Sequence, residues 1–365
     1  MTHAGALHEY SAKLPLFSKH WFVKIIFQDT AVNLDTMQRY IFKRILMLIP
    51  VILGVSLLVY VMMDLAPGNM IDMISGDMTE QEVAKLYHEY GYDRSVFYRY
   101  FHYMKGLFQG DLGYSPVYRQ EVWKLYMQRL PATIKLAGAS ILVCIVLSIP
   151  LGIKSATKRG SLTDNTCSVL AILGLSMPNF WLGLMLMVYF GLKLHWLPSS
   201  GDTEGIKSLI LPAFTVGTGL MATLMRTTRS SMLDVLRQDY LRTARSKGVP
   251  ERTVINKHAL RNALIPIITV IGNQMGHALG GAVVTENVFS WPGVGRMLID
   301  AIRQRDTNTV TGCLIMTTIM ISVIMLIVDI VYAFADPRLK GQYATYKKTK
   351  AEPSKPAGKE GGASA

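Results

Sequence analysis

Side chains that could do chemistry are few inside the long apolar stretches of this 365-residue sequence. The cysteines Cys144, Cys167 and Cys313 lack a CxxC spacing, which predicts small buried hydrophobic residues and no disulfide framework. His277 and Asp329 are groups of the kind that relays protons in membrane carriers. One histidine and one aspartate near the end of its stretch make a poor relay. His277 is therefore either a helix-packing residue or a pathway residue, and Asp329 is expected to be structural or interfacial.

Motifs for nucleotide binding and hydrolysis are absent from the sequence. It contains no Walker-A loop, no HExxH zinc pair, no GxSxG elbow and no Rossmann fingerprint. Gly217 and Gly219 form a short GxG string inside an apolar run, where small residues allow helices to approach closely. We therefore expect no catalytic residue, no metal site and no cofactor on this chain, and any energy coupling would have to come from elsewhere, most economically from a partner protein.

The polar segment 225–262 has the pattern of two short helices joined by a turn. Gly248 suits a left-handed helix C-cap. Pro250 and Glu251 then suit the first turn of a second helix. The apolar edge of the first helix repeats every four residues and consists of Met232, Leu236, Tyr240 and Ala244.

An apolar face outside a membrane needs something to pack against. The residues alone leave two interpretations of this basic segment: a loop lying on lipid, or a docking element for a cytosolic subunit. Nucleic-acid binding is disfavoured, because both ends of the segment lie within a few residues of apolar runs that could cross a membrane.

The elements that position this segment are long uncharged runs, because 50% of the residues are hydrophobic and only 17% are charged. About 20 apolar residues suffice to cross a bilayer as a helix. The sequence thus predicts an all-α integral membrane protein with about six transmembrane helices. The six runs are 45–63, 136–153, 165–192, 208–225, 262–285 and 307–328.

The charges between the runs predict the orientation. With a cytoplasmic N-terminus, the inner segments carry +15 in total and the outer segments −1. Lysine and arginine number 25 inside and 13 outside. Positive charge favours the cytoplasmic side, so we expect a multi-pass protein of the cytoplasmic (inner) membrane with both termini in the cytoplasm and anionic lipid beside its inner loops.

Three regions follow from these patterns. Residues 1–40 form an N-terminal extension, which is either an interfacial helix or a weakly ordered leader. Residues 41–340 form the transmembrane domain, with a sizeable outer loop at 64–131 and the cytoplasmic helix-turn-helix at 227–262. In the outer loop, Thr79 to Met104 is expected to be helical and to start with a capping box. Residues 341–365 are expected to be a disordered cytoplasmic tail.

Several short motifs in order resemble the permeases of ATP-binding-cassette (ABC) importers of the oligopeptide, dipeptide and nickel family, first of the two permease types. The segments Asp239–Gly248 and His258–Ala263 resemble the family's coupling loop, although Arg242–Ala244 departs from the general Glu-Ala-Ala motif. The resemblance covers roughly 40–340. Its other motifs are Ile49–Val51, Gly54–Ser56, Leu65–Gly68, Gly110–Gly113, Arg129–Thr133, Pro150–Gly152, Phe180–Gly183, Trp196–Pro198, Val288–Arg296 and Asp336–Arg338.

The resemblance implies a transport subunit that is not itself an enzyme. Its implied partners are a second homologous permease, two cytosolic ATPase subunits that bind ATP and Mg²⁺, and an extracytoplasmic solute-binding protein. Peptides would be the solute, with nickel or another small solute as the alternative. An ion-coupled carrier, an intramembrane enzyme and a scaffold remain as other function classes. The residues implied to contact the ATPase or shape the loop are Asp239, Tyr240, Arg242, Ala244, Lys247, Gly248 and His258.

Overall fold

The computed structural model describes residues 34–76 and 78–335. The predicted tail and most of the predicted N-terminal extension lie outside these residues. Helix α2 (Leu34–Leu65) runs through residue 40, so it crosses the boundary expected between extension and transmembrane domain. The chain divides into two compact units, and the description that follows concerns the unit Leu46–Tyr332.

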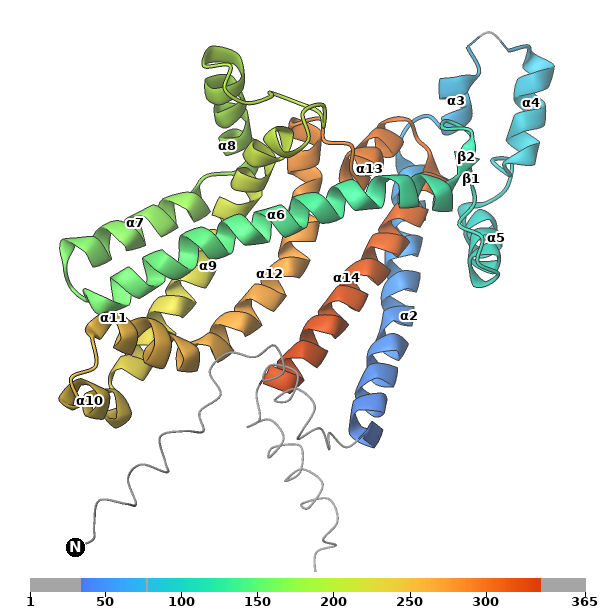
Figure 1. Cartoon of the computed structure of the whole chain (residues 1–365). Coiled ribbons are helices and arrows are strands. Elements are labelled where there is room, and N and C mark those ends of the chain that lie inside the picture. The colour runs from blue at the N-terminus through green and yellow to red at the C-terminus, as the bar shows by residue number, and fades with distance from the viewer. Residues whose placement is uncertain (1–33, 77, 336–365) are drawn as a thin grey trace, which may run out of the picture. The chain divides into compact units, whose positions relative to one another are not determined.

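Helices dominate the described residues, and five of them are long and apolar enough to cross a membrane. A sixth crossing is possible if a bent pair of helices forms one span. This matches the expected all-α membrane fold with about six spans. The five helices are α2, α6 (Val122–Thr157), α9 (Ile206–Leu236), α12 (Leu260–Val288, which extends a helix starting at Glu251) and α14 (Thr307–Ala335) (Figure 1).

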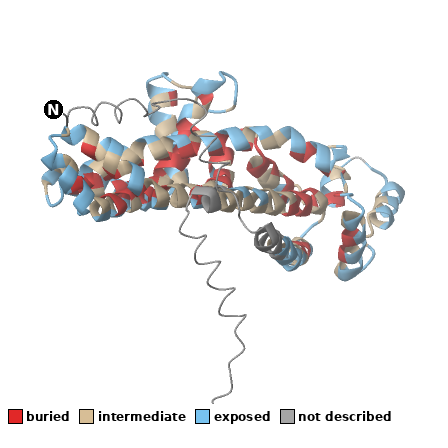
Figure 2. Ribbon diagram, turned by 60° about the horizontal axis from the view of Figure 1, so that its bottom comes forward, coloured by how far each residue is buried: buried red, intermediate tan, exposed pale blue. Residues whose placement is uncertain are grey.

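Helix α9 is the central helix of this unit. Of its most apolar stretch 67% is buried, against 11% for α2 and for α14. It packs closely on α6, because a Cβ atom at Gly217 would lie 2.7 Å from the Ser140 carbonyl oxygen and one at Gly152 would lie 2.6 Å from Thr228. Small residues at such crossings let helix backbones approach. Buried residues accordingly gather where the long helices pack together (Figure 2).

The third apolar run, expected as a span over 165–192, is bent. Helix α7 (Leu162–Ser176) meets the next helix at an angle of 100°. Met177 has an extended ψ of 124° because the ring of the following proline disfavours a helical conformation there. The second part is α8 (Asn179–Leu186), which continues as the π-helix η1 (Met187–Lys193).

The loop between α2 and α6 is a small helical subdomain. Thr79 and Glu82 form the expected capping box at the start of α4. The helix expected over Thr79–Met104 is interrupted, because Gly91 takes a left-handed φ of +69°. The elements of this loop are α3 (Met70–Ile74), α4 (Glu80–Glu89), α5 (Val96–Phe108), and the antiparallel two-residue strands β1 (Tyr114–Ser115) and β2 (Gln120–Glu121).

Helix α6 begins at Val122, well before the apolar run at 136, so the last part of the predicted outer loop is already helical. We call the end of the bundle that carries this loop the loop end. The opposite end, where α9 ends and α12 begins, is the turn end. The remaining elements are α10 (Asp239–Ser246), α11 (Glu251–Thr253) and the π-helix η2 (Val254–Ala259) at the turn end, and α13 (Val294–Arg303) at the loop end.

Candidate functional site

Helix α10 lies at the turn end as a separate short helix. The expected apolar stripe from Met232 to Ala244 is divided between two helices, because α9 ends at Leu236 and α10 begins at Asp239. Gln238 between them is extended, with φ −75° and ψ 142°. Helix α10 can therefore take its own direction relative to α9.

Leu241 anchors α10 to the bundle. Its side chain is fully buried in an apolar cluster with Met232, Val254 and Ala263. Ala244 packs on the same cluster from the next turn of α10. Sequence reasoning missed Leu241, because it assigned the contact face to the series through Tyr240. The spacing of Leu241 and Ala244 at i and i+3 was the available signal.

The turn after α10 is built as expected around Gly248. Its φ is +73°, a left-handed conformation that only glycine adopts without strain, and a Cβ there would meet nothing within 4 Å. The amide of Gly248 donates to the Arg245 carbonyl at 2.9 Å. Arg245 also holds the next helix by two hydrogen bonds of 2.9 and 3.0 Å to the Glu251 carboxylate, which raise the pKa of the arginine.

The chain returns to the membrane through a π-helix. Residues of η2 follow α11 and lead without interruption into α12. Such π-turns often occur at functional sites. Here the turn presents the His258 carbonyl, which accepts from Asn262 Nδ2 at 3.2 Å and from Tyr240 Oη at 3.5 Å. Asn262 Nδ2 also donates to Tyr240 Oη at 2.6 Å, so Asn262 is a further residue that joins α10 to α12.

The residues predicted from the sequence thus fall into two groups. Tyr240, Ala244, Gly248 and His258 come together in the contacts that hold α10 and the turn. Asp239, Arg242 and Lys247 are exposed on the outside of the same element. The arrangement is a short basic helix held by one apolar anchor, with a charged outer face. It can bind another protein or a charged surface.

His277 lies about halfway along α12, on the side of the helix that is exposed in this chain. Asn273, Gly280 and Val284 are exposed on the same side at helical spacing. Within this chain His277 is therefore not packed inside the bundle. Among the described residues there is also no cluster of histidine, cysteine and acidic side chains that could hold a metal ion.

A buried carboxylate at the loop end was not predicted. Glu286 is fully buried, and its carboxylate accepts from Thr133 Oγ1 at 2.7 Å and from the Gly295 and Arg296 amides at 2.7 and 3.1 Å. These amides belong to the first turn of α13. A Cβ at Gly293 would lie 2.2 Å from Oε1 of this carboxylate, so only glycine fits there.

A second buried carboxylate lies towards the turn end. Asp164 is 4% exposed and accepts from Arg229 Nε at 2.9 Å and Nη2 at 2.8 Å. Ser155 Oγ and the Gly160 amide complete its hydrogen bonds. The ion pair ties α7 to α9 just before the chain enters α10. The linear sequence gave no signal for it beyond the charges themselves.

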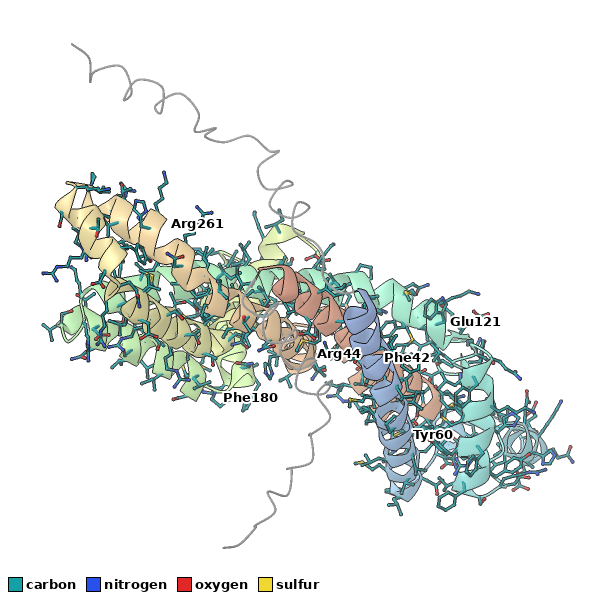
Figure 3. All side chains as sticks on the ribbon, turned by 90° about the horizontal axis from the view of Figure 1, so that it is seen from below. Phe42, Arg44, Tyr60, Glu121, Phe180 and Arg261 are labelled. Carbon is teal, nitrogen blue, oxygen red and sulfur yellow. The ribbon has the colours of Figure 1, made fainter. Side chains whose placement is uncertain are left out.

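Arg261, labelled in Figure 3, lies at the start of α12, next to the α10 turn.

Comparison with known proteins places these features in a family. The family model "Binding-protein-dependent transport system inner membrane component" matches residues 148–341, and the model of its N-terminal part matches residues 37–137.

Curated relatives align over nearly their whole length. The di/tripeptide transport system permease protein DppB of Pseudomonas aeruginosa is 38% identical over 84% of this chain and 100% of that protein. The dipeptide permease DppB of Escherichia coli K12 is 37% identical over 83% of this chain and 99% of that protein. The oligopeptide permease AppB of Bacillus subtilis is 40% identical over 83% and 100%.

The fold also matches a solved structure, an inward-facing form of the MetNI methionine ABC transporter. The TM-score is 0.50 at 15% identity, covering 58% of this chain and 96% of the other. At this identity the match concerns the fold alone. Together with the family models, which span both the loop subdomain and the α10 turn, it leads to one conclusion: the chain belongs to the binding-protein-dependent transport system inner membrane components, the permease family of ABC importers.

Proposed function

We propose that this chain is the permease subunit of an ATP-driven peptide importer and forms half of the translocation pathway for di- or oligopeptides. The observation that carries the proposal is the α10 turn, a basic helix held at the turn end by Leu241 with Asp239, Arg242 and Lys247 exposed. The peptide solute is supported by relatives named as di/tripeptide, dipeptide and oligopeptide permeases.

In this proposal the α10 turn docks on a cytosolic ATPase subunit. The turn end would then face the cytoplasm, both termini would be cytoplasmic, and the loop end would face the solute-binding protein. The excess of lysine and arginine on the turn-end side supports this orientation. The chain itself would hold no cofactor, and ATP with Mg²⁺ would bind to two partner ATPases.

The same helix that carries the turn would line the pathway. Helix α12 continues from the π-turn η2 past His277, whose exposed side can face a second, homologous permease. A displacement of α10 would be transmitted to His277 through α12, which is continuous with η2. Intramembrane histidines exposed within one subunit often mark such polar paths.

Affinity purification from native membranes in mild detergent tests the assembly. The tagged chain is expected to recover two Walker-motif ATPases, a second six-span permease and, in part, a solute-binding protein, identified by mass spectrometry. A di- to pentapeptide series, with Ni²⁺ as comparison, then tests the solute in uptake assays on the reconstituted complex. Recovery of the chain alone as a stable, transport-active protein would contradict the proposal.

Two variants of Gly248 make the same experiment specific for the turn. Gly248→Val places a β-branched residue at a φ of +73°, which strains the turn, whereas Gly248→Asn tolerates this conformation better. We expect the valine variant to insert normally but to lose most ATPase recovery and peptide uptake, and the asparagine variant to keep most of both. Equal recovery and uptake in the two variants would exclude the turn as the docking element.

A further inference from the structure

Helix α5 packs against the sides of two membrane-spanning helices, well below their loop ends. Its Tyr100 hydroxyl donates to the Leu53 carbonyl of α2 at 3.0 Å, and its ring lies 5.7 Å from that of Tyr60, which is labelled in Figure 3. Leu53 precedes the end of α2 at Leu65 by 12 residues, about 18 Å along a helix.

Helix α14 gives the same depth independently. Ile315 is buried in the cluster with Tyr100, and Ile319 packs on that cluster. These residues follow the start of α14 at Thr307 by 8 and 12 residues, about 12 and 18 Å along the helix. Figure 1 shows α5 beside the half of α2 that is nearer the loop. Part of the loop subdomain therefore lies at the depth of the spans.

The sides of α5 differ in character. Phe97, Phe101 and Phe108 are 60%, 68% and 77% exposed and fall within about 40° of one another around the helix. Arg99 and Gly106 lie on the roughly opposite side. Arg99 is paired with Asp64 near the end of α2, and Gly106 lies beside Asp111 in the loop.

Because the arginine and phenylalanine sides of α5 are opposite, the position of Arg99 shows which way the phenylalanine side faces. Asp64 lies one residue before the end of α2, whereas Leu53 lies deep in the span. The side of α5 that faces Asp64 is therefore turned away from the membrane interior, and the phenylalanine side is turned towards it. The cavity of about 400 Å³ that α5 forms with the rest of the loop, Tyr60 and the start of α14 is lined on the α5 side by residues that include Arg99, His102 and Gly106, and by none of the three phenylalanines.

We propose that α5 is an amphipathic helix embedded in the lipid leaflet at the loop end, with Phe97, Phe101 and Phe108 among the acyl chains. Exposed apolar side chains occur on α2 as well, where Leu58 and Met62 are 58% and 61% exposed on the side away from α5. Such an amphipathic helix places aromatic residues in the hydrocarbon boundary and charged residues, here Lys105 on α5 and Arg94 just before it, at the headgroups. The loop subdomain is thereby held against the membrane by lipid as well as by protein.

Spin labelling tests the position of each side chain. A chain with its three cysteines replaced by alanine receives single cysteines at Phe97, Phe101 or Phe108, is reconstituted with its co-purified partners in lipid nanodiscs, and is labelled with a nitroxide. We expect collisions with oxygen, which concentrates in hydrocarbon, to exceed collisions with a water-soluble nickel chelate several-fold. Leu58→Cys on α2 is the matched lipid-facing reference. His102→Cys on α5 and Lys85→Cys on α4 are the matched controls, at which nickel collisions should dominate.

Two outcomes would overturn the proposal. Dominant nickel collisions at the phenylalanine positions would place that side in water. Low collision rates with both reagents would mean that a protein partner covers it. Because a cysteine variant can fail to assemble, a second measurement uses the unmodified chain: a lipid-soluble diazirine should label the peptide containing residues 96–108 on the phenylalanines after illumination, and absence of that label would equally overturn the proposal.

Discussion

Helix α6 binds two buried carboxylates, which are held by different means. Thr133, a third of the way along the helix, binds Glu286, and Ser155 near its end binds Asp164. The two α6 residues are 22 positions apart, about 33 Å along the helix and close to the thickness of the hydrocarbon core. One helix thus connects a polar clamp at the loop end with another towards the turn end.

The partners of the two carboxylates differ. Glu286 accepts hydrogen bonds from one hydroxyl and two backbone amides of α13 and has no cationic partner among its hydrogen bonds. Asp164 is held by Arg229, whose side chain is 31% exposed and reaches it from α9. Backbone amides at a helix N-terminus are fixed in place, whereas an arginine side chain has several rotatable bonds.

The difference indicates how the two ends can behave during transport. At the loop end, α13 cannot move relative to α6 and α12 without losing the hydrogen bonds of a buried carboxylate, which is costly. Towards the turn end, α9 can shift a little while Arg229 keeps its ion pair. We therefore expect movement that starts at α10 to be accommodated near Asp164 and resisted near Glu286.

Of the changes that test this comparison, removal of the Glu286 carboxylate should lower the free energy of unfolding most. Glu286→Ala leaves Thr133 and two amides of α13 without their acceptor in a buried site, which should lower the free energy of unfolding by about 3–4 kcal/mol. Glu286→Gln keeps the shape and one acceptor oxygen and should cost less than about 1.5 kcal/mol. Thermal unfolding in detergent, followed by tryptophan fluorescence, measures both.

Gly293 provides an internal control for the same site. Gly293→Ala should destabilise the native chain, because the new methyl group would lie 2.2 Å from the Glu286 carboxylate, and should cost much less in the Glu286→Ala background, where that space is open. Purely additive effects of the two substitutions would show that the carboxylate does not set the position of α13.

Loss of the ion pair near the turn end should have the next largest effect. Arg229→Met leaves the buried Asp164 with only Ser155 and the Gly160 amide, and should cost about 2–3 kcal/mol, less than a fully buried pair because Arg229 is partly exposed. Adding Asp164→Asn should recover part of this loss, since the unpaired charge is then removed.

The double-mutant cycle is read by thermal unfolding as before. A single Arg229→Met variant as stable as the native chain would mean that the ion pair is incidental. The expected contrast between the two ends would also fail if this variant were less stable than Glu286→Ala.

Neither clamp could be predicted from the sequence. In the sequence, Glu286 and Asp164 are charges that border the apolar runs 262–285 and 165–192. The hydroxyl partner of Glu286 is 153 residues away, and Arg229 is 65 residues from Asp164. No local spacing connects such pairs, because they are formed by helix packing. Their location at the boundaries of spans made each look like an ordinary loop charge.

Features set by local chemistry were predicted correctly. Thr79 and Glu82 form their capping box, and Gly248 takes the left-handed turn. The apolar run at 165–192 was predicted as one of the spans, but its bend was not, because the proline at position 178 breaks the helix within an otherwise uniformly apolar stretch. The predicted face of α10 was wrong by one residue, since the break at Gln238 changes the register between Met232 and Leu241.

The exposed ion pair of the turn should have the smallest effect. Arg245 and Glu251 make two hydrogen bonds, but their side chains are 40% and 56% exposed, so water screens the attraction. Arg245→Gln should lower the free energy of unfolding by less than about 1 kcal/mol. Leu241→Ala is the matched comparison on the same helix, and it should cost about 2–4 kcal/mol because Leu241 is fully buried.

If Arg245→Gln cost as much as Leu241→Ala, the turn would be held by its charges. The turn end would then resemble the loop end in depending on polar contacts, and the expected freedom of α10 to move would have no physical basis.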